Sequence, residues 1–182
     1  ALVGMSFLST TSYPYAKILA RQIRVADASV KLAFGGVFAS LNAGLVKLQC
    51  PEVDFVCRGN GEQLLLDLLD RIDDPKDVCG VTWAKDGKVI NNPNRTMERQ
   101  LDQWPFPDRE SLELDFVESM PLDVPAVLSM ERFTTMQTSR GCPWPCVFCD
   151  IPIFNEGKWR APSAQHVVVE LKFLEANGYG SV

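Results

Sequence analysis

Short apolar stretches alternate with amphipathic stretches through the first 72 residues of the chain. The apolar stretches end at polar or glycine-rich breaks, which indicates buried β-strands. Between them, apolar residues recur at helical spacing, as Ala16, Leu19 and Ile23 do. This alternation predicts βαβ units in a Rossmann-like (flavodoxin-like) α/β domain with a parallel sheet. The predicted strands are residues 2–8, 31–34 and 53–57, and the strongest predicted helix carries Leu65, Leu68, Leu69 and Ile72.

Three polar loops directly follow the predicted strands, at residues 9–12, 35–38 and 58–62. The carboxyl ends of parallel strands meet at one edge of a sheet, where ligands of α/β proteins bind. Two of these loops contain glycines, which let a ligand approach the backbone closely. We therefore expect a ligand site at this edge.

The pattern changes after Asp73. Apolar residues 81–84 and 88–90 flank Lys85-Asp86-Gly87, a hairpin signal. The prolines of Trp104-Pro105-Phe106-Pro107-Asp108 oppose regular structure and suit an interdomain linker. The expected organisation is an α/β domain over 1–91, a linker over 92–130 and a second domain over 131–182.

A further strand–helix pair is predicted in the last 50 residues. Residues 133–138 have the composition of a strand and lead into a cysteine-rich loop. A helix should begin at Pro162 and Ser163, carry Val167, Leu171 and Leu174 as its apolar stripe, and end near Gly178. The pattern predicts a new strand after this helix, so the order predicts another βα unit.

Cys142, Cys146 and Cys149 have the spacing C-x3-C-x2-C. Thiolates are ligands of iron–sulfur clusters and of zinc. Three thiolates on one tight loop hold three irons of a cubane, and the fourth iron keeps the open position that catalysis needs. A cluster is the favoured interpretation. Zinc, with the single histidine, His166, as a possible fourth ligand, and a coincidental or disulfide spacing are the alternatives.

Three further cysteines are scattered through the chain. Cys57 ends a predicted strand and Cys79 opens another, so packing in the core is expected for both. Cys50 precedes Pro51 at a loop edge. The functional alternative is a second cluster held by these three cysteines.

Composition narrows the class of protein. The net charge of −5 over 182 residues gives no basic footprint for nucleic acid. No apolar run approaches the roughly 18 residues of a membrane span, and no signal peptide is visible. We expect a cytoplasmic protein. Because the chain starts without Met and both ends interrupt predicted elements, we expect a fragment of a longer protein, with an α/β domain incomplete at its N-terminus.

The cysteine loop resembles that of the radical S-adenosylmethionine enzymes, whose C-x3-C-x-aromatic-C motif is matched by Cys142, Cys146, Phe148 and Cys149. The resemblance implies a [4Fe–4S] cluster whose open iron binds S-adenosylmethionine, reductive cleavage to a 5′-deoxyadenosyl radical, and Phe148 near the adenine. It also implies a partial TIM barrel, of which residues 131–182 would be the first β/α unit, and an electron donor such as flavodoxin or ferredoxin.

Nearly the whole chain is similar to the cobalamin-binding branch of these enzymes. The resemblance implies that Ser6, Gly35 and Gly36 line the cobalamin tail and that the turn from Gly59 to Glu62 lies beside the cofactor. Phe38 and Asn60 depart from the family pattern, which often has His and Glu there. The matching stretches are residues 2–6, 35–41, 53–62, 104–109 and 159–163.

The resemblance implies methyl transfer or a radical rearrangement on a small organic substrate, with the fragment itself inactive because later barrel strands are missing. A cobalamin-free radical S-adenosylmethionine enzyme and a methylthiotransferase remain open. So does a protein without enzyme activity, either an iron–sulfur electron-transfer module or a zinc-stabilised interaction module.

Overall fold

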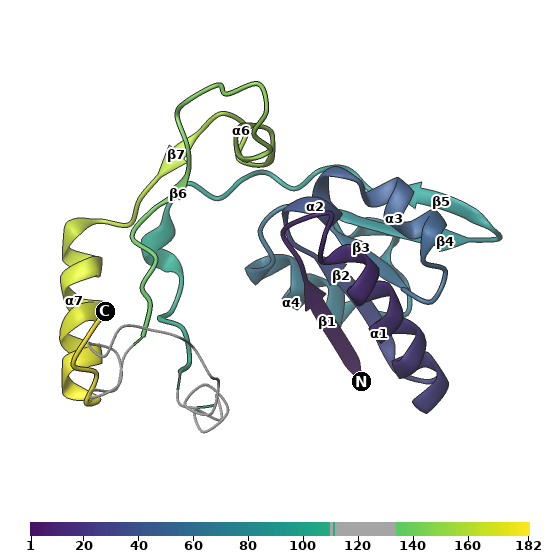
Figure 1. Ribbon diagram of the computed structural model, residues 1–182, viewed down its shortest axis with the longest axis horizontal. Helices are drawn as coiled ribbons and strands as arrows, with labels where there is room; N and C mark the ends of the chain where they lie inside the picture. Colours follow the sequence, from purple (N-terminus) through teal and green to yellow (C-terminus); the bar gives the residue numbers. More distant parts are fainter. Residues whose placement is uncertain (110, 112–133) are drawn as a thin grey trace. The chain divides into compact units, whose positions relative to one another are not determined.

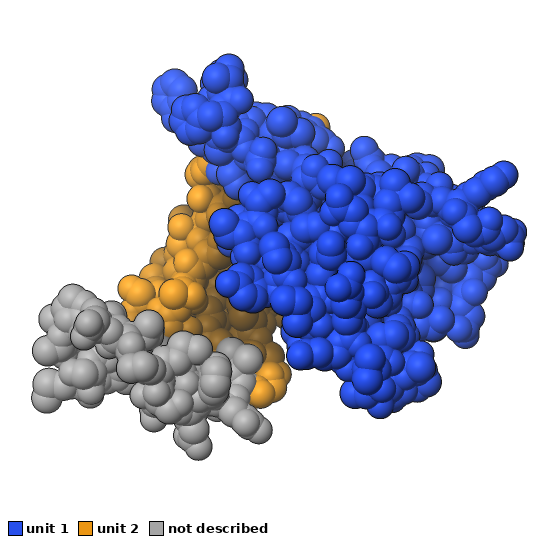
Figure 2. Space-filling model, turned by 45° about the vertical axis from the view of Figure 1, so that its right-hand side comes forward, with its two compact units in different colours: residues 1–97, 141–158 blue, residues 98–140, 159–182 orange. Residues whose placement is uncertain are grey.

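The computed structural model describes residues 1–109, 111 and 134–182. These residues form two compact units, coloured blue and orange in Figure 2. Unit 1 contains residues 1–97 and 141–158, and unit 2 contains the described residues of 98–140 together with 159–182. The predicted domain limits at 92 and 130 stay a prediction, because part of that segment lies outside the described residues.

Unit 1 is built on a five-stranded sheet with the order β1-β2-β3-β4-β5 (Figure 1). Its first three strands are parallel, and the last two add an antiparallel hairpin at the edge. The predicted α/β class with a parallel sheet is therefore confirmed, and so is the hairpin. The strands are β1 (Leu2–Ser6), β2 (Lys31–Gly35), β3 (Phe55–Cys57), β4 (Val81–Lys85) and β5 (Lys88–Asn91).

Helices cover both faces of this sheet. Alternate residues of β2 and β3 enter two separate cores, as a period of two requires. Leu32, Phe34 and Val56 pack in one core, with side chains from three helices. Ala33, Phe55 and Cys57 pack in the other, with Leu64 and Leu68 of the fourth helix. The helices are α1 (Tyr13–Ala26), α2 (Val37–Leu41), α3 (Ala43–Gln49) and α4 (Glu62–Asp70), followed by the 3₁₀ turn η1 (Pro75–Asp77).

The apolar face of α4 differs from the prediction. Leu64 and Leu68 are fully buried, whereas Leu65 is 38% and Leu69 is 50% exposed. Leucines occupy both sides of this helix, so periodicity alone did not identify which side meets the sheet.

Unit 2 is organised around α7 (Ala164–Ala176), the helix predicted after the cysteine loop. Ser163 caps it, since its hydroxyl accepts a hydrogen bond from the His166 amide at 3.1 Å. Leu174 of the predicted stripe is fully buried, Val167 is half-buried and Leu171 is 41% exposed. The remaining elements after β5 are η2 (Leu101–Gln103), β6 (Arg140–Gly141), α6 (Ile151–Phe154) and β7 (Trp159–Arg160).

The strand predicted over 133–138 is wrong for residues 134–138, which have no regular structure; residue 133 lies outside the described part. A short ribbon of β6 and β7 follows instead. The amide of Thr134 does donate to the Ser181 carbonyl at 3.1 Å. One such bond does not make a sheet, so the partial barrel stays a prediction.

The segment before residue 110, predicted as a linker, packs on α7. Phe106 contacts the rings of His166 and Phe173, with centroids 5.0 and 5.7 Å apart. The Arg109 guanidinium lies 2.9 Å from the Glu170 carboxylate, and each side chain is only 8% exposed. Arg109 also donates to the Thr135 carbonyl at 2.9 Å. A buried ion pair with these bonds makes the segment part of unit 2.

Replacing Glu170 by Ala should strongly destabilise unit 2. The change leaves the Arg109 charge buried without its partner, which costs about 3–5 kcal/mol. Hydrogen exchange of full-length protein should show faster exchange across residues 164–176. Glu175→Ala, on the exposed side of the same helix, is the control and should leave exchange there nearly unchanged. Equal effects of the two substitutions would contradict a structural role for the pair.

Candidate functional site

The predicted ligand edge forms where β1, β2 and β3 end. The register pairs Ser6, the last residue of β1, with Gly35, the last residue of β2. Gly59 lies in the turn after β3, and Glu62 begins α4. Ser6 is exposed, and the other three residues are half-buried. The structure thus places the sequence-predicted contacts on the ends of neighbouring parallel strands.

The fold itself requires a glycine at position 36, because the backbone of Phe7 lies where a side chain would be. Its φ is +92°, and a Cβ there would lie 2.2 Å from the Phe7 carbonyl oxygen. Real atoms do not approach so closely, so any side chain at this position displaces the loop after β1. The sequence interpretation assigned this glycine to ligand approach, but its own fold already requires it.

Gly35 is different. A Cβ on Gly35 would meet no atom within 4 Å, and its φ lies outside the left-handed region. Nothing in the described protein therefore demands a glycine there. An open strand end where a Cβ would project into free space leaves room for a ligand to approach the backbone.

The structure shows what surrounds Phe38 and Asn60, the two residues that depart from the family pattern. Phe38 contacts Phe7 and Tyr13, with ring centroids 6.0 and 5.2 Å apart, so this position completes an aromatic cluster. The Asn60 Nδ2 atom is buried and donates no hydrogen bond within the described residues. The turn after β3 therefore holds an unused donor beside Gly59.

Ser40, on α2, lies in the matching stretch 35–41, and the sequence predicts no role for it. Its hydroxyl donates to the Gly36 carbonyl at 2.7 Å and accepts from the Gly59 amide at 3.0 Å. It therefore links the turn after β2 to the turn after β3. No local sequence signal identifies this bond, because Gly59 lies 19 residues further along the chain.

The cysteine loop begins with a constrained glycine and contains a tight turn. A Cβ on Gly141, where φ is +88°, would lie 2.0 Å from the Lys158 carbonyl oxygen, so the two ends of the loop approach closely. The Cys149 amide donates to the Cys146 carbonyl at 3.1 Å, which is a β-turn. The turn keeps these two cysteines near each other.

The structure does not assemble a complete metal site from the residues that it describes. No group of three Cys, His, Asp or Glu side chains there has the arrangement that holds a metal ion. Cys146 is exposed, and Cys142 and Cys149 are half-buried. The assignment of these three cysteines as ligands stays a prediction.

The surroundings of the loop fit the donor set of a cluster. The amides of Trp144, Cys146, Val147 and Phe148 donate to no backbone carbonyl in the described part of the chain. Such amides are the donors that stabilise cluster sulfides. Phe148, the predicted adenine contact, is 88% exposed, so nothing described here covers its ring.

The cysteine loop and the ligand edge adjoin within unit 1. Helix α6 follows the last cysteine, and α2 follows Gly35 and Gly36; these two short helices contact each other. This contact brings together two parts of the chain that lie about a hundred residues apart in the sequence. Any ligand on the open strand ends would lie on the same unit as the cysteines.

Among the described residues, Cys50, Cys57 and Cys79 are not grouped as metal ligands, and a second cluster stays an alternative. Burial raises the pKa of Cys50 to about 11 and that of Cys57 to about 12, which opposes thiolate ligation. Core packing is confirmed for Cys57. It is wrong for Cys79, which is exposed because its neighbours Val78 and Gly80 turn inward.

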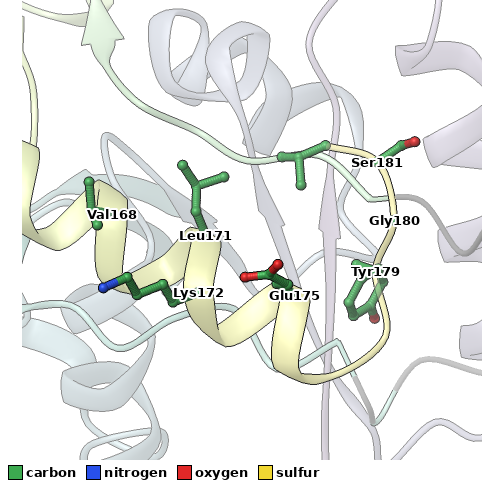
Figure 3. Close-up of a pocket in the computed structure, with 8 residues that line it drawn as sticks. Val168, Leu171, Lys172, Glu175, Tyr179, Gly180 and Ser181 are labelled. Atoms are coloured by element: carbon green, nitrogen blue, oxygen red, sulfur yellow. The ribbon is translucent and has the colours of Figure 1, made fainter.

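The exposed side of α7 forms an open groove with the last residues of the chain (Figure 3). Val168 and Leu171 give it an apolar wall, and Lys172 and Glu175 lie beside them. None of the sequence-predicted site residues lines it. His166, the possible zinc ligand, packs against Phe106.

Comparison with known proteins places these features in context. No family model matches the chain. An uncharacterised methyltransferase of Pyrococcus horikoshii is 31% identical over 177 residues, covering 95% of this chain and 36% of that protein. The anaerobic magnesium-protoporphyrin IX monomethyl ester cyclase of Rubrivivax gelatinosus is 26% identical over 155 residues, covering 81% of this chain and 26% of the cyclase. The chain thus spans about a third of the methyltransferase and about a quarter of the cyclase.

Among solved structures, the fold matches the radical S-adenosylmethionine methyltransferase TsrM of Kitasatospora setae. The TM-score is 0.71 at 16% identity for TsrM with tryptophan and a SAM analogue bound, covering 97% of this chain and 35% of TsrM. The score is 0.68 at 14% identity for TsrM with cobalamin and a [4Fe–4S] cluster bound. At this identity the match establishes the fold.

The structure defines an α/β domain whose parallel strands end at an open edge, together with a loop that carries three cysteines at C-x3-C-x2-C spacing. The resemblance predicted from the motifs is confirmed: over most of its length the chain is similar to proteins named as a methyltransferase and as a magnesium-protoporphyrin cyclase, and it shares the fold of the cobalamin-binding enzyme TsrM. Each helix in the described part of the chain is too short or too polar to cross a membrane.

Substitution of the two adjacent glycines should change the free energy of unfolding by different amounts. Gly36→Ala forces a side chain against the Phe7 backbone and a left-handed φ, so it should lower the free energy of unfolding by about 2 kcal/mol or more. Gly35→Ala should change it by less than about 1 kcal/mol. Urea unfolding of both variants, followed by circular dichroism, measures the difference. Equal losses would refute the distinction between them.

Proposed function

We propose that the protein of which this chain is part is a cobalamin-dependent radical S-adenosylmethionine enzyme that transfers a methyl group to a small organic substrate. The observation that carries the proposal is the contact between α2 and α6, which joins the open ends of β1–β3 to the cysteine loop in one unit. The names of the relatives, a methyltransferase and a magnesium-protoporphyrin IX monomethyl ester cyclase, support the same class.

The proposed cluster ligands are Cys142, Cys146 and Cys149. A bound [4Fe–4S] cluster supplies the single electron that cleaves S-adenosylmethionine. The β-turn from Cys146 to Cys149 keeps the backbones of these two cysteines close, and Gly141 permits the close approach between the two ends of the loop. The amides of Trp144, Cys146, Val147 and Phe148, which donate to no backbone carbonyl in the described residues, would offset the negative charge of a cluster. Phe148 offers an exposed ring on which an adenine would stack.

The proposed cobalamin contacts are Ser6, Gly35, Gly36, Gly59 and Glu62. Bound cobalamin supplies a methyl carrier. The residues themselves provide a strand edge without side-chain obstruction at Gly35, a hydroxyl at Ser6, and the donor of Asn60 beside them. Phe38 lacks a ligating nitrogen, so this position offers apolar contact alone.

A second candidate reaction is radical ring formation or rearrangement, favoured by the relative from Rubrivivax gelatinosus, whose name is that of a cyclase. A radical S-adenosylmethionine enzyme without cobalamin is the next alternative, because Phe38 and Asn60 depart from the family pattern. We also propose that a reducing protein such as flavodoxin or ferredoxin supplies the electron. The proposed location is the cytoplasm.

Anaerobically reconstituted full-length protein should contain about four irons per chain and show a brown chromophore. Replacing Cys142, Cys146 or Cys149 by Ala should abolish the chromophore, because a cubane needs all three thiolates. Cys79→Ala, also exposed, is the matched control and should retain it. Iron analysis and absorbance spectra measure both. Stoichiometric zinc without iron would instead support the zinc module.

Full-length protein should bind hydroxocobalamin, and Gly35→Val should weaken binding at least about tenfold by filling the open strand end. Gly4→Val is the control: Gly4 also lies on a strand with open space around its Cβ, but two residues before the edge. Absorbance titration measures both affinities. Absence of corrinoid binding by the wild-type protein would leave the cobalamin-free enzyme as the better proposal.

A further inference from the structure

The hydroxyl of Ser40 lies between the two glycine turns of the ligand edge. It donates to the Gly36 carbonyl at 2.7 Å and accepts from the Gly59 amide at 3.0 Å. The Cys57 carbonyl, at 3.5 Å, is too distant to compete. The Ser40 hydroxyl therefore uses its hydrogen on the turn after β2 and a lone pair on the turn after β3.

The bond to Gly36 is local, and the bond to Gly59 is not. A helical serine often donates to the carbonyl four residues before it, and this contact alone has no bearing on a ligand. The bond to the Gly59 amide joins α2 to the turn after β3. Because the hydroxyl hydrogen points to Gly36, a lone pair is directed at Gly59, and each bond strengthens the other.

Other contacts hold the two sides of the β3–α4 turn but not its centre. The Arg58 amide donates to the Gly80 carbonyl at 2.8 Å, and the Arg58 guanidinium contacts Asn94 at 2.7 Å. On the far side, the Gly61 carbonyl accepts from the Leu65 amide at 2.9 Å. Among the described residues, the bond that fixes Gly59 relative to Gly36 is that of Ser40.

We infer that Ser40 is a positioning residue that sets the spacing of the two glycine turns and thereby the shape of the cofactor edge. The inference rests on the proposed function, since it takes a corrinoid with its nucleotide tail as the ligand. Ser40 acts through the backbone of Gly36 and Gly59 and does not itself contact the ligand.

The test compares Ser40→Ala and Ser40→Thr in full-length protein. Ser40→Ala removes both hydrogen bonds and should weaken hydroxocobalamin binding about five- to twentyfold. Ser40→Thr keeps the hydroxyl and should bind within about threefold of wild type. Ser29→Ala is the matched control, because the Ser29 hydroxyl bonds only to the nearby Asp27 among described side chains, away from this edge.

Hydrogen exchange of the peptide that contains Gly59 gives a second readout, independent of cofactor. In wild type the Gly59 amide should be protected, in Ser40→Ala it should exchange at least about tenfold faster, and Ser40→Thr should restore protection. An unprotected Gly59 amide in wild type would overturn the inference even if Ser40→Ala fails to fold.

The remaining outcomes separate the inference from the proposed function. If wild type binds hydroxocobalamin and Ser40→Ala binds equally well, Ser40 has no positioning role and the proposed function stands. A loss that Ser40→Thr does not rescue, or that Ser29→Ala reproduces, also overturns the inference. If wild type binds no corrinoid, the proposed function fails and the inference fails with it.

Discussion

The close approach of the Phe7 backbone to Gly36 is the contact on which the ligand edge depends. The Phe7 amide continues the pairing of β1 with β2 by donating to the Gly35 carbonyl at 3.1 Å. Because of this register, the Phe7 backbone occupies the space that a side chain on residue 36 would need. The same approach brings Phe7 against Phe34 and Phe38, so the loop after β1 closes over an aromatic core.

Once this edge is formed, the rest of unit 1 is arranged around α2. One side of that short helix supplies Ser40, which reaches the turn after β3. The helix also contacts α6, next to the cysteine loop. A five-residue helix has little stability of its own, because nucleation costs more than a few hydrogen bonds return. Its contacts with the turns and α6 therefore hold it in place.

Unit 2 is stabilised differently. Its proline-rich segment cannot pair with a sheet through regular hydrogen bonds, so side chains attach it to α7 instead. Phe106 supplies apolar contact, and Arg109 supplies a buried charge whose partner is Glu170. A buried ion pair adds little net stability compared with an apolar contact, but it strongly disfavours arrangements in which either charge is unpaired. The ion pair therefore fixes the position of the proline-rich segment on α7 more than it raises the stability of unit 2.

Sequence patterns by themselves determined the three parallel strands, the hairpin, α1 and α4 of unit 1, the edge where the three predicted loops gather, and the C-x3-C-x2-C spacing, but they did not predict the short helices α2 and α6. These properties are local, because propensity and spacing act within one element. The tertiary structure decided which face of α4 is buried, that Cys79 is exposed, and that Gly36 serves the fold while Gly35 leaves open space. It also decided that Ser40 meets Gly59 and that Arg109 meets Glu170. Each of these depends on register and packing between residues distant in the chain, which no local pattern encodes.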